Sequence, residues 1–200
     1  MGKPIKRPDW EEYFMFMAIS CAVRGSCPKR KVGAVIVKKN RVIATGYNGA
    51  PKGLTNCLQL GYCHYERLAH IEAETNGKKF SEVRENFKYL HCLAVHAEVN
   101  AISQCSRQEV EGATLYITNY PCPKCVQDVI ITYGFEKVRV YKEYLINPLL
   151  TIDEKRASER KLLEAGISLT YVLLKKERIL EIANHMADDV GERTDYKFSQ

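Results

Sequence analysis

The sequence predicts an α/β fold of three layers, in which about five strands form a mixed sheet with helices on both faces. In the second half of the chain, short β-branched runs alternate with helical patterns, which is typical of a mainly parallel sheet. Near the N-terminus, two such runs are separated by only Lys38, Lys39 and Asn40, which predicts an antiparallel hairpin at one edge. The fold class is therefore expected to be of the α/β/α type.

The expected elements follow from caps, breakers and periodicity. Asp9 can cap a helix that ends at Gly25, and residues 32–37 and 41–45 form the hairpin. The later elements are helices at 97–106, 123–133 and 153–165 and strands at 113–119, 137–141 and 168–174. We expect a single domain over residues 1–174, followed by a packing helix (176–189) and a loose tail (191–200) within 175–200.

An irregular segment at about 46–92 interrupts this order. It is rich in Gly, Pro and Asn and then in charged residues, and its charged stretch at 66–88 predicts one irregular helix. We therefore expect an insert in the domain at this point.

Composition limits the classes of function. The hydrophobic share of 46% is enough for a packed core, and a net charge of +6 suits a phosphate-bearing ligand without requiring a polynucleotide. The apolar stretch at 13–23 follows acidic residues, unlike a signal peptide, and no stretch has the length of a membrane span. The eight cysteines are therefore expected to be reduced, in a cytoplasmic protein without a membrane partner.

The most informative motif pairs His96-Ala97-Glu98 with Pro121-Cys122-Pro123-Lys124-Cys125. A hydrolytic zinc site has three protein ligands and leaves one position for water, and His96, Cys122 and Cys125 supply three. Glu98, two residues after the histidine, is placed to exchange protons with water and substrate without binding the metal. The pattern H-x-E with P-C-x-x-C is the signature of zinc nucleobase deaminases.

Other interpretations of the cysteine pair explain less. A redox C-x-x-C gives no reason for His-Ala-Glu at the head of the preceding helix. A zinc ribbon requires a second C-x-x-C, which the sequence does not contain.

Four segments together resemble a known family: residues 31–37 (KVGAVIV), 45–53 (TGYNGAPKG), 96–102 (HAEVNAI) and 121–125 (PCPKC). Over about residues 10–174 the chain is similar to the phage-type deoxycytidylate (dCMP) deaminases of the cytidine deaminase-like superfamily. The resemblance implies zinc-dependent hydrolysis of dCMP to dUMP and ammonia, which supplies dTMP synthesis, with Glu98 as the acid and base. It further implies that Asn48 and the backbone of Ala97 hold the base and sugar. Tyr120 either flanks the pyrimidine or packs on the core.

The resemblance also implies a homo-hexamer that dCTP activates and dTTP inhibits, with Mg²⁺ accompanying the triphosphate. Gly46, Tyr47 and Gly49 correspond to the effector loop. The basic candidates for phosphate contact are Lys31, Lys52 and Arg107, for which the alternative is a solvated surface charge. A second, structural zinc is implied for ligands among Cys27, Cys57, Cys63, His91 and Cys92, and the alternative is buried thiols without metal.

Two rival functions remain open. A deaminase acting on a base in tRNA or single-stranded DNA shares the zinc chemistry but needs a basic, aromatic surface, and the charges of the insert are mixed. A non-catalytic zinc-stabilised nucleotide-binding module does not require Glu98. The sequence alone does not distinguish dCMP from cytidine, dCTP or 5-substituted dCMP.

Overall fold

The computed structural model of the chain describes residues 6–142 and 150–191, with side chains of the last helix as far as His185. The sheet has five strands, β1 (Gly33–Lys38), β2 (Arg41–Tyr47), β3 (Thr114–Ile117), β4 (Lys137–Tyr141) and β5 (Ser168–Val172), in the order β2-β1-β3-β4-β5. Strand β1 is antiparallel to both of its neighbours, whereas β3, β4 and β5 are parallel. The predicted mixed sheet with a hairpin at one edge is confirmed.

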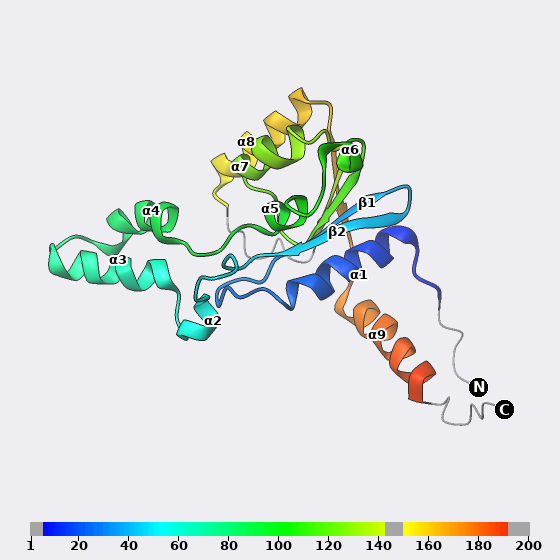
Figure 1. Ribbon diagram of the computed structural model, residues 1–200, viewed down its shortest axis with the longest axis horizontal. Helices are drawn as coiled ribbons and strands as arrows, with labels where there is room; N and C mark the ends of the chain where they lie inside the picture. The colour runs from blue at the N-terminus through cyan, green and yellow to red at the C-terminus, as the bar shows by residue number, and fades with distance from the viewer. Residues whose placement is uncertain (1–5, 143–149, 192–200) are drawn as a thin grey trace.

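Helices cover the sheet on both faces (Figure 1). They are α1 (Trp10–Ala22), α5 (Ala97–Ile102), α6 (Arg107–Val110), α7 (Pro123–Cys125) with the π-helix η1 (Val126–Ile131), α8 (Ile152–Glu164) and α9 (Lys176–Gly191). Strand β1 alternates between two cores because successive side chains of a strand point to opposite faces. Ala34 and Ile36 join a core with α5, η1 and α8, while Val35 and Val37 join a core with α1 and α9. The three-layer fold class is therefore correct.

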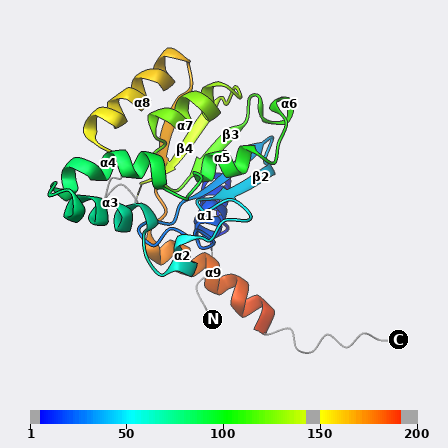
Figure 2. The same ribbon diagram turned by 60° about the vertical axis from the view of Figure 1, so that its left-hand side comes forward.

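The insert differs from the prediction. Instead of one irregular helix it contains α2 (Cys57–Leu60), α3 (His64–Thr75) and α4 (Phe80–His91), and α3 and α4 lie side by side as a hairpin that projects from the sheet (Figures 1 and 2). Gly77, at φ +63°, makes the turn between α3 and α4. Ala69, Ala73 and Val83 form a small core between the two helices, and Phe80 and Phe87 of α4 pack against it. The alanine face of α3 gives only a weak apolar pattern.

Smaller differences concern element ends. The helix expected at 97–106 stops at Ile102, because Ser106 caps the separate helix α6. The helix expected at 123–133 is α7 continued by η1, and β2 runs on to Tyr47. The last helix begins where expected, and most of the predicted tail lies outside the described residues.

Over the described stretches of chain, no helix combines the length and the apolar character needed to cross a bilayer.

An ion pair joins the first and last helices. Glu12 of α1 accepts from Arg178 of α9 at both carboxylate oxygens, with distances of 3.2 Å (Nε to Oε1) and 3.0 Å (Nη2 to Oε2). The hydrogen bond from Arg178 is the main cause that lowers the pKa of Glu12 in the folded chain. A lowered carboxyl pKa stabilises the fold above the unfolded value, and this contribution is lost as the pH falls through the folded pKa.

Replacement of Glu12 by glutamine is therefore expected to lower the free energy of unfolding at pH 7 by about 1 kcal/mol. Glutamine can still accept the capping hydrogen bond from the Asp9 N–H, so the variant tests the charge and not the cap. The difference from the unmodified chain should vanish as the pH falls below the ordinary range of a glutamate. Urea unfolding at several pH values measures it, and a difference that persisted in acid would contradict the assignment. Glu181→Gln, a more exposed partner of Arg178, serves as the control.

Candidate metal centre

The three predicted ligands converge on one point from two helix N-termini. His96 is the N-cap of α5, directly after Val95, which pairs with Gly49 in an isolated antiparallel bridge. Cys122 is the N-cap of α7 and Cys125 is its last residue, with Pro123 at the first helical position. Proline suits that position because its N–H would have no helical partner there.

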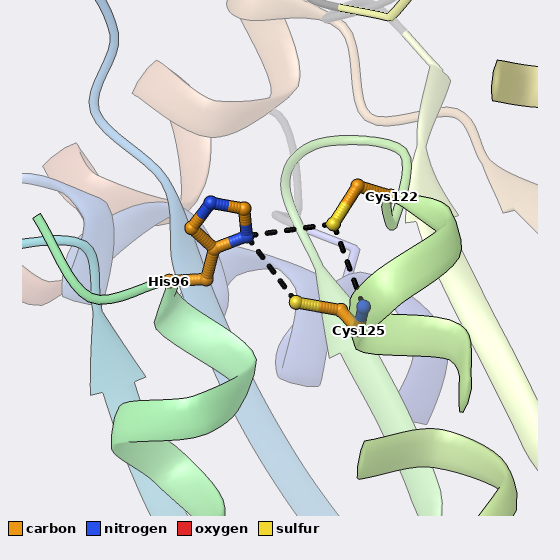
Figure 3. Close-up of side chains that lie close together, drawn as sticks. All are labelled: His96, Cys122 and Cys125. Atoms are coloured by element: carbon orange, nitrogen blue, oxygen red, sulfur yellow. Dashed lines mark hydrogen bonds between the residues drawn. The ribbon is translucent and has the colours of Figure 1, made fainter. Parts of the chain in front are cut away.

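The side chains of the three residues face one another (Figure 3). His96 Nδ1 lies 3.2 Å from Cys125 Sγ and 3.6 Å from Cys122 Sγ. Among the side chains described, those of residues 6–142 and 150–185, this is the only group of three histidine, cysteine or acidic residues whose ligand atoms all lie within 4.8 Å of one another. Tetrahedral zinc with ordinary Zn–N and Zn–S bonds would hold nitrogen and sulfur about 3.6 Å apart. The donor atoms and their spacing therefore fit zinc.

The charges of the group suit a cation. The pKa of Cys122 is lowered to about 4, first by a hydrogen bond from the Cys125 thiol and also by His96. The Cys125 N–H also points to Cys122 Sγ, at 3.4 Å. The pKa of Cys125 is raised because its thiol donates to this thiolate, and the hydrogen bond to Cys122 raises the pKa of His96 to about 9. The shift at Cys122 favours its thiolate, which suits a cation, and metal binding is coupled to the loss of protons from the other ligands.

Glu98 lies beside the ligands and is almost fully buried, with 4% of its surface exposed. Burial raises the pKa of its carboxyl, while the neighbouring His96 opposes this shift. Cys122 and Cys125 also contribute to the pKa of the Glu98 carboxyl. The carboxyl is therefore near all three ligands. A carboxyl with a raised pKa can both take up and release a proton nearer to neutral pH than an ordinary glutamate can.

Strand β2 supports the helix that begins with His96. A Cβ atom on Gly46 would lie 2.3 Å from Ala97 O and 2.5 Å from Ala101 N, so only glycine allows α5 to approach this closely. Asn100 donates to Tyr47 O at 2.7 Å. Gly46, predicted as an effector contact, therefore has a packing role in the described structure.

The predicted substrate residues occupy different environments. Asn48 accepts from Val32 N at 2.7 Å and donates to Arg30 O at 2.9 Å, so its amide braces the loop before β1. Ala97 is buried at the start of α5. Tyr120 is 6% exposed in the core with η1 and α8, and its buried hydroxyl has no hydrogen-bond partner among the described residues. Its core environment agrees with the packing interpretation.

The predicted effector residues do not gather in one place within the chain. Tyr47 is 37% exposed at the end of β2, near Gly49 and on the same edge of the sheet as the cysteines that follow β3. Lys31, before β1, donates to Val23 O. Arg107 lies on α6, which precedes β3, so it is at the opposite edge. Lys52 is exposed in the loop after β2.

Four of the five residues suggested for a second zinc share one small cavity. Cys27, Cys57, Cys63 and Cys92 line a space of about 20 Å³, enough for about one water-sized occupant. Burial raises the pKa of Cys63 and of Cys92. His91 is not among the lining residues, and its ring lies 4.9 Å from that of Phe87. All eight cysteines are free.

One polar residue that the sequence did not single out touches the cysteine turn. Ser158 of α8 is fully buried and donates to Pro121 O at 3.0 Å. A serine within a charged helix gives no local signal of such a distant contact, so only the tertiary structure identifies it.

Comparisons with known proteins agree with this geometry. The model of the family "Cytidine and deoxycytidylate deaminase zinc-binding region" matches residues 8–142. The chain is 42% identical over 139 residues to the deoxycytidylate deaminase of Mycobacterium phage D29, covering 70% of this chain and 99% of the relative. It is 38% identical over 177 residues to the deoxycytidylate deaminase of Saccharomyces cerevisiae, covering 87% of this chain but only 48% of the yeast protein.

A solved structure shares the fold. The dCMP deaminase of cyanophage S-TIM5, crystallised with dCMP and dUMP, superposes with a TM-score of 0.57 at 24% identity, covering 84% of this chain and 99% of that one. The family match spans more than half of the sequence and includes all three metal-ligand candidates. The chain therefore belongs to the cytidine and deoxycytidylate deaminase zinc-binding family.

Proposed function

We propose that this chain catalyses the hydrolytic deamination of dCMP to dUMP and ammonia, which supplies dTMP synthesis. The observation that carries the proposal is the group His96, Cys122 and Cys125 beside the buried Glu98. The extent of the similarity to a phage deoxycytidylate deaminase, 99% of whose length aligns, supports dCMP as the substrate.

In the proposed reaction, water adds its oxygen to C4 of the cytosine, the C4–N4 bond breaks, and ammonia leaves. Zinc held by three protein ligands supplies a Lewis acid and an activated water at neutral pH. Glu98 would accept a proton from the attacking water and deliver it to N3. It would then take the second proton from the new C4 hydroxyl and pass it to the amino group, so that the C4=O bond forms as ammonia leaves. Its burial excludes bulk water as a competing proton donor.

We propose that Asn48, the backbone of Ala97 and Tyr120 hold the base and sugar. Asn48 is supported by its rigid attachment to the loop before β1, since a residue fixed by two hydrogen bonds can present its remaining donor without loss of entropy. Tyr120 is supported by its position two residues before Cys122.

We propose regulation of the family kind: a homo-hexamer activated by dCTP with Mg²⁺ and inhibited by dTTP. The exposed Tyr47 beside Gly49 supports a ligand contact at the edge of β2. Since Arg107 lies at the opposite edge, it would meet this region only across subunits, whereas Lys31 and Lys52 flank the edge within the chain.

We propose that the cavity lined by Cys27, Cys57, Cys63 and Cys92 binds a second zinc, because four thiols are the donor set of a structural zinc site. No three of their sulfurs lie within 4.8 Å of one another, so the side chains would have to close around the ion. His91 is an alternative ligand, which would replace one of the four cysteines. Cys92→Ser is expected to remove one zinc ion per chain in metal analysis, while His96→Ala removes the other. A single zinc per chain in the unmodified protein, lost in His96→Ala and unaffected in Cys92→Ser, would contradict this site.

We propose further that the deaminase domain extends to about residue 174 and that the protein works in the cytoplasm. The continuation of the sheet into β5 supports the domain boundary. The free state of all eight thiols suits a reducing compartment.

The test of the function is product analysis after incubating the zinc-loaded chain with dCMP, cytidine or dCTP separately. Conversion of dCMP alone to dUMP is the expected result, and dCTP with Mg²⁺ should increase it. A short cytosine-containing DNA strand and a tRNA are tested in parallel, and conversion of either without conversion of dCMP would replace the proposal. If none of the substrates is converted while zinc is bound, the non-catalytic module is the better description.

A further inference from the structure

Helix α8 makes two polar contacts with the turn that carries Cys122, and neither belongs to the family signature. The first is the hydrogen bond from the Ser158 hydroxyl to Pro121 O, at 3.0 Å. The second runs from Lys161 Nζ to Pro123 O, at 3.5 Å, and the same amine donates to Gln127 Oε1 at 2.6 Å. The two carbonyl groups belong to the residues immediately before and after Cys122. Helices α7 and α8 lie against each other in the fold (Figure 1).

The contact of Ser158 is unusual for a serine within a helix. Such a hydroxyl commonly donates to a carbonyl of its own helix, as Ser20 in α1 does to Phe16 O, four residues earlier. Ser158 instead reaches a residue 37 positions away in the sequence. Its side chain is fully buried, so water cannot replace it as the donor.

Because the peptide bond is planar, the hydrogen bond to Pro121 O also restrains the backbone of Cys122. One plane contains the carbonyl oxygen of Pro121 and the nitrogen and Cα of Cys122. When the Pro121 oxygen is held in place, the position of the Cys122 Cα is therefore restrained. Proline rings restrict φ at residues 121 and 123, on both sides of the cysteine. The Pro121–Cys122 peptide plane therefore sets the point from which the Cys122 side chain starts, and Pro123 holds the backbone of Cys122 in the extended region.

We propose that Ser158, assisted by Lys161, is a positioning residue that orients Cys122 for the metal. This inference rests on the zinc site proposed above. Partners that orient ligands in this way typically change metal affinity by about 10-fold to 100-fold when they are removed. Ser158 is expected to have the larger effect because its hydrogen bond is shorter and fully buried, whereas Lys161 is only half-buried.

The test compares Ser158→Ala with Thr118→Val in the full-length chain. Both substitutions remove one buried hydroxyl, but Thr118 Oγ1 accepts from Gly33 N between β3 and β1 and does not touch the cysteine turn. Zinc affinity is measured by competition with a chelator, and the coordination geometry by the absorption bands of the cobalt-substituted protein. Unfolding is followed in the zinc-free state to separate stability from metal binding.

We expect Ser158→Ala to weaken zinc binding by about 10-fold or more and to change the cobalt spectrum. Thr118→Val should lose comparable stability and keep both metal readouts. Equal zinc affinities and spectra for the two variants would overturn the inference. If Ser158→Ala does not fold, Lys161→Met decides: a fall of about threefold in affinity is expected, and an unchanged affinity and spectrum would reject the role of α8.

The unmodified chain and His96→Ala are measured in the same series. If the unmodified chain does not bind zinc, the proposed function fails, and with it the premise of this inference. If the unmodified chain binds zinc and loses it in His96→Ala while Ser158→Ala behaves normally, only the role of Ser158 is rejected.

Discussion

Replacing Glu98 by glutamine is expected to reduce the deamination rate of dCMP by about 10²-fold to 10⁴-fold. Glutamine has nearly the same shape and fits the same buried space, but it cannot accept a proton from water or return one to the amino group. Glu98 is not among the three metal-ligand candidates, so zinc content should remain unchanged. The measurement is the rate of dUMP formation at saturating dCMP, with zinc analysed in the same sample.

A matched control is Glu72→Gln, a half-buried glutamate of α3 whose side chain forms an ion pair with Lys78 at 3.4 Å. It carries the same change of charge and should keep full activity. A Glu98→Gln rate within tenfold of the unmodified chain would exclude Glu98 as the proton carrier. Loss of zinc together with activity would instead indicate that the carboxyl supports the metal site.

The metal centre was predictable because its signal is local in the sequence. The spacing of Cys122 and Cys125 places both at the start of one helix, and His96 and Glu98 are separated by one residue at the start of another. Helix caps and strand ends are set by neighbouring residues, so the sequence also predicted where both helices begin. The pattern H-x-E with P-C-x-x-C predicted that the two motifs would meet, and the described structure brings their side chains together.

Features that depend on distant contacts were not predictable. In the sequence, a glycine at position 46 indicates only that the backbone is free to adopt an unusual conformation there. The structure shows that α5 occupies the space that a side chain would need. The α3–α4 hairpin was missed because α3 contributes only Ala69 and Ala73 to the shared core, which is a weak pattern, although α4 contributes Phe80, Val83 and Phe87 at helical spacing. Ser158 and Pro121 are 37 residues apart in the sequence, so no local pattern indicates the hydrogen bond between them.

The close contact at Gly46 leads to the second prediction with a large effect. An alanine there would place its Cβ against Ala97 O and Ala101 N, which are backbone atoms of one helix and cannot move separately. Helix α5 must therefore shift as a unit, and His96 at its N-terminus moves with it. The cysteines are carried by a separate turn after β3, so they do not follow. We expect Gly46→Ala to destabilise the fold by about 3 kcal/mol or more and to weaken zinc binding in the molecules that remain folded.

Gly33 provides the matched control on the other face of the sheet. A Cβ there would lie 2.0 Å from Ala18 O and 2.5 Å from Ala22 N, so Gly33→Ala displaces α1 and should cost similar stability. Because α1 carries none of His96, Cys122 and Cys125, the folded fraction of this variant should bind zinc normally at the site that these three residues form. Denaturant unfolding and chelator competition on both variants separate the two effects. If Gly46 served only an effector phosphate, Gly46→Ala would leave stability and zinc affinity unchanged and alter only the response to dCTP. That outcome would show that the contact with α5 adapts more easily than its backbone geometry implies.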